Sequence, residues 1–212
     1  MLRPRIAAVL LLTTLLTTVL TVFSSQPQAS ANESQQLRQQ LSQITAGQSV
    51  SGSFEQDKVL HGLDISLHSS GKFDFRDDLL LWQVTAPIAT ELQISRDQIV
   101  QFEDGREVFR LRAEDQPLSR LISDIFLAVF SGDWQQLEQH FVLQLSGQID
   151  NWIVQLTPRN ELITHFASAI EIRGGAQLDS LQLQERNGDR STIRFQHNPS
   201  ATASRPLAPG EK

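Results

Sequence analysis

The amino-acid sequence predicts an α+β fold, in which helices cover a curved antiparallel sheet of about ten strands. Apolar and polar residues alternate along most of the chain, which is typical of strands with one buried face. One broad apolar helix interrupts this alternation in mid-chain, and turn-forming pairs such as Asp104-Gly105 and Asn187-Gly188 separate strands. An antiparallel sheet with this many strands must curl or close.

The folded part of the chain begins with an amphipathic helix over residues 32–44. Leu37, Leu41 and Ile44 share one helical face, and Ala46-Gly47 ends the helix. After this point the hydrophobic repeat changes from that of a helix to that of a strand. The alternation predicts five strands, at residues 50–55, 63–67, 72–76, 79–84 and 91–95.

A hairpin and the broad helix follow in mid-chain. Asp104-Gly105 is a strong two-residue turn signal between strands at 99–103 and 106–111. Pro117 suits the first position of a helix, and Ser131-Gly132 ends it. The helix has a wide apolar stripe formed by Leu118, Leu121, Ile122, Ile125 and Val129, which Phe126, Leu127 and Phe130 broaden.

Short strands return in the last third of the chain. A short helix is expected at 133–138 and a helical turn at 160–166, and the glycine pairs 174–175 and 187–188 mark hairpin turns. Residues 198–212 are mostly small residues and proline, which predicts a mobile tail after a single domain at 32–197. Alternation predicts the strands at 141–145, 152–156, 170–173, 181–183 and 193–195.

An export signal precedes these elements. Two arginines give a basic start, residues 6–23 form an apolar run without charge, and Ala29-Ser30-Ala31 is a small-residue cleavage site. We expect cleavage near Ala31-Asn32, which removes residues 1–31. The alternative is a membrane anchor, because the apolar run reaches the lower limit for a spanning helix, but the cleavage site that follows disfavours it.

Composition excludes several classes of function. The formal net charge is −6, which argues against nucleic-acid binding and against electrostatic attachment to anionic lipid surfaces. The chain contains no cysteine, so disulfides and thiolate metal sites are absent. The five histidines are scattered without ligand spacing, and we expect neither a metal nor a cofactor.

A set of short motifs runs along the chain in a particular order. They are Ser53-Phe54-Glu55-Gln56, Gly71-Lys72-Phe73, Arg76 followed after six residues by Trp82 and after five more by Pro87, Asp104-Gly105, and Leu156-Thr157-Pro158. In this order and spacing the sequence resembles the periplasmic outer-membrane lipoprotein carrier family, the LolA-like proteins, over residues 33–196. It departs from the family at Asp77, where a proline is usual.

The resemblance implies a periplasmic carrier protein. Its fold would be an incomplete β-barrel of about 10–11 strands with an α-helical lid over an apolar cavity. The implied cargo is the acyl chains of lipoproteins, taken from an inner-membrane release transporter and passed to an outer-membrane acceptor, by a monomer. Physical chemistry agrees, because each buried methylene is worth about 0.8 kcal/mol and acyl chains therefore do not cross water unescorted.

The resemblance also assigns roles to individual residues. Arg76 is the expected latch that hydrogen-bonds the lid, since a guanidinium offers five donors; pairing with Asp77 or Asp78 is the alternative. The expected lid residues are Leu118, Leu121, Ile122, Ile125 and Val129. The expected lipid-binding wall, for which ordinary core packing is the alternative, consists of Phe54, Phe73, Phe75, Leu80, Trp82, Val84, Leu92 and Ile94.

Two other classes of function fit the sequence less well. His61, Asp64 and Ser66 lie close in sequence, but alternation turns Asp64 and Ser66 toward water, and no nucleophile or zinc motif is present, so we expect no enzyme and no catalytic residue. An outer-membrane barrel needs aromatic girdles, and this chain has no tyrosine. Two alternatives stay open on the same fold: a carrier of another amphiphile, such as a glycolipid or polyene lipid, and a lipoprotein-sensing module.

Overall fold

The computed structural model describes residues 35–42, 49–63, 65–159 and 161–198. The predicted signal peptide at 1–31, the predicted end of the first helix at 44–47, Asp64 and the predicted tail beyond residue 198 lie outside the described residues. Within the described part, no helix is both long enough and apolar enough to span a membrane.

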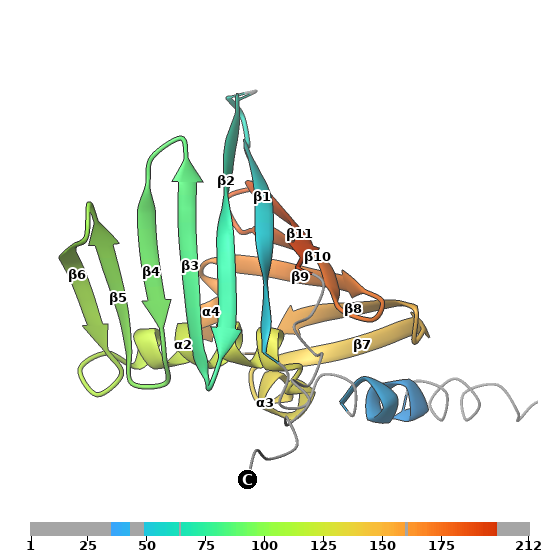
Figure 1. Cartoon of the computed structure of the whole chain (residues 1–212). Helices are drawn as coiled ribbons and strands as arrows, with labels where there is room; N and C mark the ends of the chain where they lie inside the picture. The colour runs from blue at the N-terminus through green and yellow to red at the C-terminus, as the bar shows by residue number, and fades with distance from the viewer. Residues whose placement is uncertain (1–34, 43–48, 64, 160, 199–212) are drawn as a thin grey trace, which may run out of the picture.

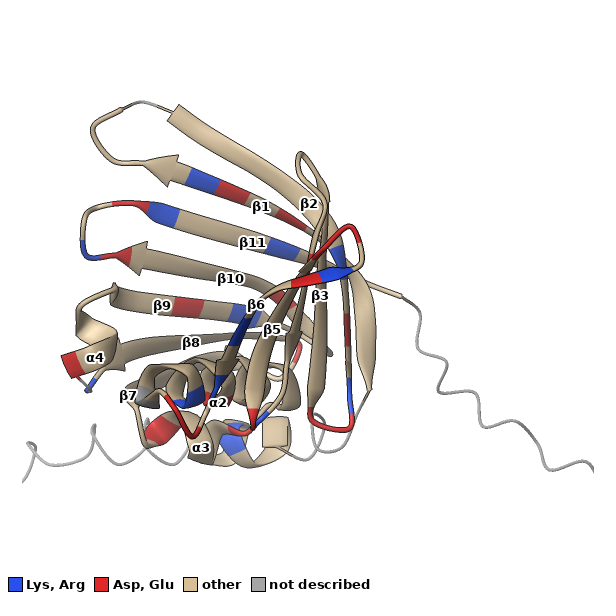
Figure 2. Cartoon of the chain, turned by 90° about the vertical axis from the view of Figure 1, so that its left-hand side faces the viewer, with Lys and Arg blue, Asp and Glu red and all other residues tan. Residues whose placement is uncertain are grey.

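One antiparallel sheet of eleven strands forms the body of the molecule, in the order β6-β5-β4-β3-β2-β1-β11-β10-β9-β8-β7. The sheet bends so that β3–β6 cross the direction of β7–β11, and α2 lies between the two groups at one end (Figures 1 and 2). The edge strands β6 and β7 do not pair with each other, so the barrel is incomplete, as predicted. The strands are β1 Val50–Leu60, β2 Ile65–Arg76, β3 Leu79–Ala86, β4 Thr90–Ile94, β5 Gln98–Glu103, β6 Arg106–Arg112, β7 Phe141–Gln148, β8 Asn151–Pro158, β9 Ala167–Gly174, β10 Leu178–Glu185 and β11 Arg190–His197.

The strands predicted separately at 63–67 and 72–76 belong to one strand, β2, which begins at Ile65 and pairs with β1 from Ile65 to Phe75. Gly71 lies in the middle of this strand, where a glycine is normally unfavourable. A Cβ there would stand 1.9 Å from the Gln83 carbonyl oxygen and 2.8 Å from the Phe54 ring. Close approach of strand β3 and Phe54 therefore requires glycine at this position.

Four helices lie within the described residues. α2 (Pro117–Ser131) begins at the predicted proline and ends at Gly132, whose φ of 65° is the left-handed conformation typical of helix ends. Ser119 fixes the first turn to the end of β6, because its hydroxyl donates to the Arg112 carbonyl at 2.9 Å. α3 (Trp134–Glu138), α4 (Glu161–Thr164) and an N-terminal helix at residues 35–42 complete the described helices.

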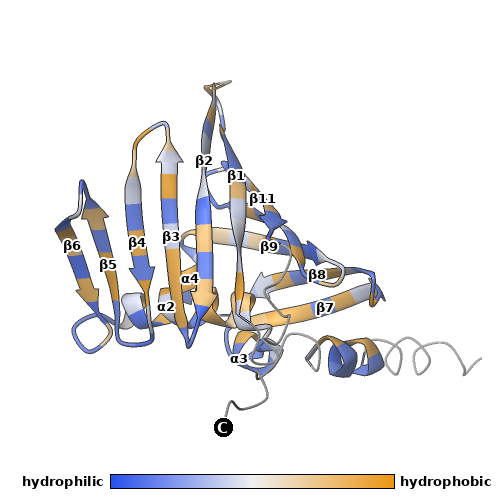
Figure 3. Ribbon diagram, viewed as in Figure 1, coloured by the Kyte–Doolittle hydropathy of each residue, from blue (hydrophilic) through white to orange (hydrophobic). Residues whose placement is uncertain are grey.

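The core consists of two hydrophobic clusters, one on each side of α2. The aromatic cluster is built by β1–β5, β11 and α2, and its buried members are Phe54, Phe73, Phe75, Leu80, Trp82, Ile94, Ile99, Leu127, Phe130 and Phe195. The second cluster joins β7–β9, α2, α3 and the N-terminal helix, and includes Leu41, Leu121, Leu137, Phe141 and Ile172. Alternating hydrophobic and hydrophilic bands along β2 and β3 show the sheet's two faces (Figure 3).

Candidate functional site

All eight residues of the expected wall lie on the concave face of the sheet and belong to the aromatic cluster. Strand alternation puts Leu80, Trp82 and Val84 on one face of β3. The register then places Phe73 beside Trp82, and Leu92 beside Trp82 on the other side. The sequence pattern therefore predicted correctly which side chains share a face.

The aromatic rings of this face are closely packed. The rings of Phe54 and Trp82 stack with their centroids 3.8 Å apart, above the glycine at position 71. From α2, Phe130 places its ring within 5.5 Å of Phe73, 5.7 Å of Phe195, 6.1 Å of Phe75 and 6.4 Å of Trp82, measured between centroids. One side chain of the helix thus fills the centre of the aromatic cluster and closes this end of the concave face.

The expected lid residues divide between the two clusters. Among them only Ile122 packs against the aromatic cluster. Leu118, Leu121, Ile125 and Val129 pack against the second cluster instead. The side chains of α2 that are buried against the aromatic wall are Leu127 and Phe130, which the predicted lid stripe left out. The signal for them was present, because these residues widen the apolar stripe on its other side.

Beyond α2 the concave face continues as apolar surface that other elements cover only in part. Val84, Leu92 and Ile193 are half-buried there. Further along β2, toward its tip, Ile65 and Leu67 are 47% and 51% exposed. Their spacing from Phe73 by even numbers of residues places both on the concave face. Apolar side chains therefore recur along this face of β2 from beneath α2 to the open tip of the β1–β2 hairpin, with Ser69 and Gly71 between them.

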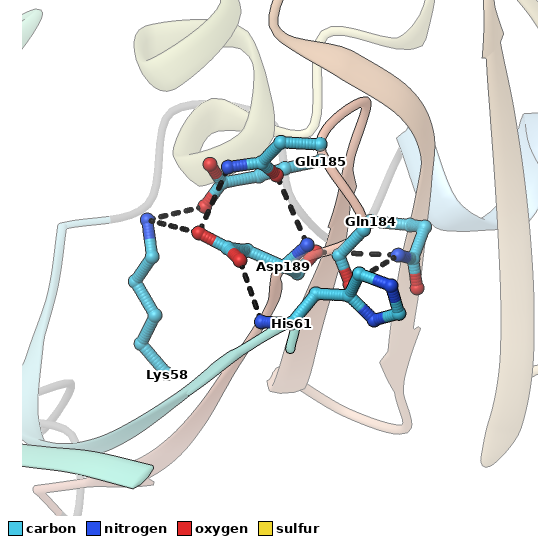
Figure 4. A network of polar contacts seen from close by, with 7 residues as sticks. Lys58, His61, Gln184, Glu185 and Asp189 are labelled. Carbon is cyan, nitrogen blue, oxygen red and sulfur yellow. Dashed lines mark hydrogen bonds and ion pairs between the residues drawn. The ribbon is translucent and has the colours of Figure 1, made fainter. Parts of the chain in front are cut away.

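A network of charged and polar groups lies beside Leu67, near the tip of the β1–β2 hairpin (Figure 4). Lys58 lies opposite Leu67 in the register, and its Nζ is 2.6 Å from Glu185 Oε1 and 3.7 Å from Asp189 Oδ2. The His61 backbone N–H donates to Asp189 Oδ1 at 2.8 Å. That hydrogen bond is the main cause that lowers the pKa of the Asp189 carboxyl, and the Glu185 carboxylate raises the pKa of Lys58. Sequence reasoning missed this network because its members come from separate hairpins.

The expected latch has a different partner in this structure. Arg76 and Asp74 are two residues apart on β2, so their side chains share one face of the strand. Phe73 and Phe75 lie on the other face. The Arg76 Nε donates to Asp74 Oδ1 at 2.7 Å, and its Nη2 also contacts that carboxylate. The Asp74 carboxylate raises the pKa of the guanidinium. Arg76 therefore forms a strand-surface ion pair here, and a latch role for it stays a prediction.

Two hollows border α2, and they differ in chemistry. A small apolar pocket of about 30 Å³ lies where the two clusters meet, at the C-terminal end of α2. An open, polar cleft of about 1000 Å³ lies beside α2, and its walls include Arg96, Arg120, Asp97 and Asp124. Ligand pockets usually occupy roughly 300–1,000 Å³ and are mostly apolar. The small pocket is thus too small for an acyl chain, and the large cleft is too polar.

A family model described as "Outer membrane lipoprotein carrier protein LolA" matches residues 45–205 of this chain. The matched span contains every strand of the sheet and α2. No curated protein matches the chain.

Three solved structures that are similar to this chain are distant from it in sequence. A LolA superfamily protein from Nitrosomonas europaea is 9% identical, with a TM-score of 0.42 over 77% of this chain and 91% of that chain. A DUF1329 family protein from Desulfovibrio piger is 14% identical, with a TM-score of 0.44 over 85% and 96%. The lipoprotein LppX of Mycobacterium tuberculosis is 12% identical, with a TM-score of 0.41 over 85% and 100%.

Proposed function

The chain belongs to the outer membrane lipoprotein carrier family, LolA, and from this premise we propose that it is a periplasmic carrier of lipoproteins. It binds their acyl chains on the concave face of its sheet. It receives them from a transporter in the inner membrane and passes them to an acceptor at the outer membrane. The wall residues of the aromatic cluster, together with Ile122 and Leu127 of α2, contact the acyl chains.

The observation that supports this proposal most strongly is the incomplete cover of an apolar face. α2 closes only one end of it, and half-buried residues such as Val84 and Leu92 continue the face outward. Soluble proteins seldom leave contiguous apolar surface exposed unless it binds something. Hydrocarbon chains suit such a surface, because each methylene that leaves water contributes about 0.8 kcal/mol.

Binding requires α2 to move. In the described conformation Phe130 occupies the centre of the aromatic cluster, so an acyl chain reaches Phe54, Phe73 and Trp82 only if α2 and its aromatic ring withdraw. The free energy of this closed packing opposes binding, which allows a carrier to release its cargo. The binding site then has two states: a closed state in which the aromatic rings are packed, and an open state in which the apolar face is exposed.

The cargo can be identified directly. The full chain is expressed with its own N-terminal segment in a Gram-negative host, purified from the periplasm without detergent, and extracted for mass spectrometry. Recovery of acylated protein in about equimolar amount is the expected result. Recovery of a free glycolipid or polyene lipid instead would assign the fold to another amphiphile. Protein that contains no lipid, and that does not take up an added triacylated lipoprotein, would contradict the carrier function.

A further inference from the structure

The small pocket at the C-terminal end of α2 contains polar groups that have no partner. Among the described residues, the indole Nε1 of Trp134 and the imidazole Nδ1 of His197 are buried without a hydrogen bond, and both residues line this pocket. Trp134 is 5% exposed. A buried polar atom without a partner costs about 1–3 kcal/mol, so native structures nearly always satisfy such atoms.

The two unpartnered atoms differ in what they offer. The Trp134 Nε1–H can only donate. The other ring nitrogen of His197, Nε2, contacts the Leu178 carbonyl, which can only accept, so Nε2 carries the proton. In the neutral imidazole Nδ1 is therefore an acceptor. Two residues that line the pocket thus carry one unpartnered donor and one unpartnered acceptor, and a group with one acceptor and one donor would complement them.

The position of the pocket links it to the proposed site. Phe130 and Val129 of α2 form part of its wall, so the same movement of α2 that uncovers the aromatic cluster also enlarges this pocket. Val50 and Leu178 connect it to the aromatic cluster. The pocket is therefore contiguous with the face on which we propose that acyl chains bind.

We infer that this pocket is a polar subsite that holds the secondary amide at the head of an amide-linked acyl chain. The amide carbonyl accepts from Trp134 Nε1, and the amide N–H donates to His197 Nδ1. An ester offers acceptors alone and leaves His197 Nδ1 without a partner. This inference rests on the proposed function and adds to it a selection between two kinds of acyl linkage.

Two probes with one chain length test the inference on the unaltered protein. N-methylpalmitamide and methyl palmitate displace a fluorescent fatty acid from the purified full chain at pH 8, and their inhibition constants are compared. The amide is expected to bind about tenfold more tightly, as one additional hydrogen bond to a buried acceptor provides. Equal affinities would overturn the subsite but leave the carrier function intact. Failure of both probes and of the fluorescent fatty acid to bind would instead contradict the carrier function.

Three variants test whether the preference for the amide depends on Trp134 Nε1 and His197 Nδ1. His197→Phe should remove the preference for the amide while the ester binds as before. Trp134→Phe should weaken both probes, because both have a carbonyl. Trp152→Phe is the matched control, since Trp152 lines the same pocket but its Nε1 already donates to the Gly175 carbonyl at 2.8 Å. An unchanged amide preference in His197→Phe, or equal losses in the two tryptophan variants, would overturn the assignment.

Discussion

At the scale of single residues, Phe130 has the largest influence on the site. It lies on α2, yet its ring contacts four aromatic rings of the sheet. Phe126, one helical turn earlier on the same helix, is 37% exposed. Two phenylalanines on one helix therefore differ in the property that matters, which is burial against the proposed binding face.

We predict that Phe130→Ala lowers stability and raises affinity for acyl chains. Removing a buried phenylalanine ring lowers the free energy of unfolding by about 3–5 kcal/mol. The ring is packed only in the closed state, so its removal destabilises the state that competes with ligand binding. Urea unfolding measures the first effect and titration with a fluorescent fatty acid the second. Phe126→Ala is the control and should change both far less. Weaker binding by Phe130→Ala would show that the ring contacts the lipid instead of excluding it.

The ion pair of Arg76 with Asp74 leads to a prediction that competes with the latch. The guanidinium lies on the outer face and pairs with Asp74, so Arg76→Ala should leave hydrogen exchange in Pro117–Ser131 unchanged. Asp74→Ala removes the same ion pair and is the matched control. Faster exchange across α2 in Arg76→Ala, but not in Asp74→Ala, would restore the latch that the family resemblance implies.

At the scale of elements, α2 shows what a sequence pattern can and cannot predict. Its limits followed from Pro117 and Ser131-Gly132, and its apolar width from the periodicity. Which residues of the stripe meet which cluster did not follow, because two apolar surfaces compete for one helix. Leu127 and Phe130 could be assigned to the aromatic wall only when the bend of the sheet was known.

The β strands also show which features a sequence pattern predicts and which it does not. Alternation identified the shared face of the eight wall residues, since a period of two fixes the side of every residue on a strand. It did not show that β2 continues through Gly71, because glycine weakens the interior of a strand, and only the close approach of the Gln83 carbonyl and the Phe54 ring explains it there. The contacts of Lys58 with the β10–β11 turn depend on pairing between segments far apart in sequence.

The network around Asp189 leads to a prediction about pH. The folded-state pKa of this carboxyl is lowered, so its stabilising contribution is present above the pKa of an unfolded aspartate, about 3.9. That contribution disappears as the pH falls through the lower folded-state pKa. Asp189→Asn should therefore be less stable than the wild type at pH 7, with a difference that narrows below about pH 4. Urea unfolding at pH 7 and pH 3 tests this, and a difference independent of pH would contradict it.

At the scale of the whole molecule, an open sheet bends around one helix, and that helix covers only part of the apolar face of the sheet. The acidic balance of the chain, with net charge −6, keeps its surface soluble, and charges of both signs interrupt β1 and β9 (Figure 2). The sequence could predict the class of fold and the apolar face, since both follow from local pattern. The degree to which α2 closes that face depends on packing at a distance.

The central claim is that acyl chains bind beneath α2, on the aromatic wall, and not in the polar cleft beside it. Trp134→Phe combined with Trp152→Phe leaves Trp82 as the only tryptophan among the three of the chain, and a brominated fatty acid quenches tryptophan fluorescence on contact. Saturating brominated palmitate should quench the fluorescence of Trp82, and the unbrominated acid should not. Binding detected by calorimetry without any quenching of Trp82 would contradict it.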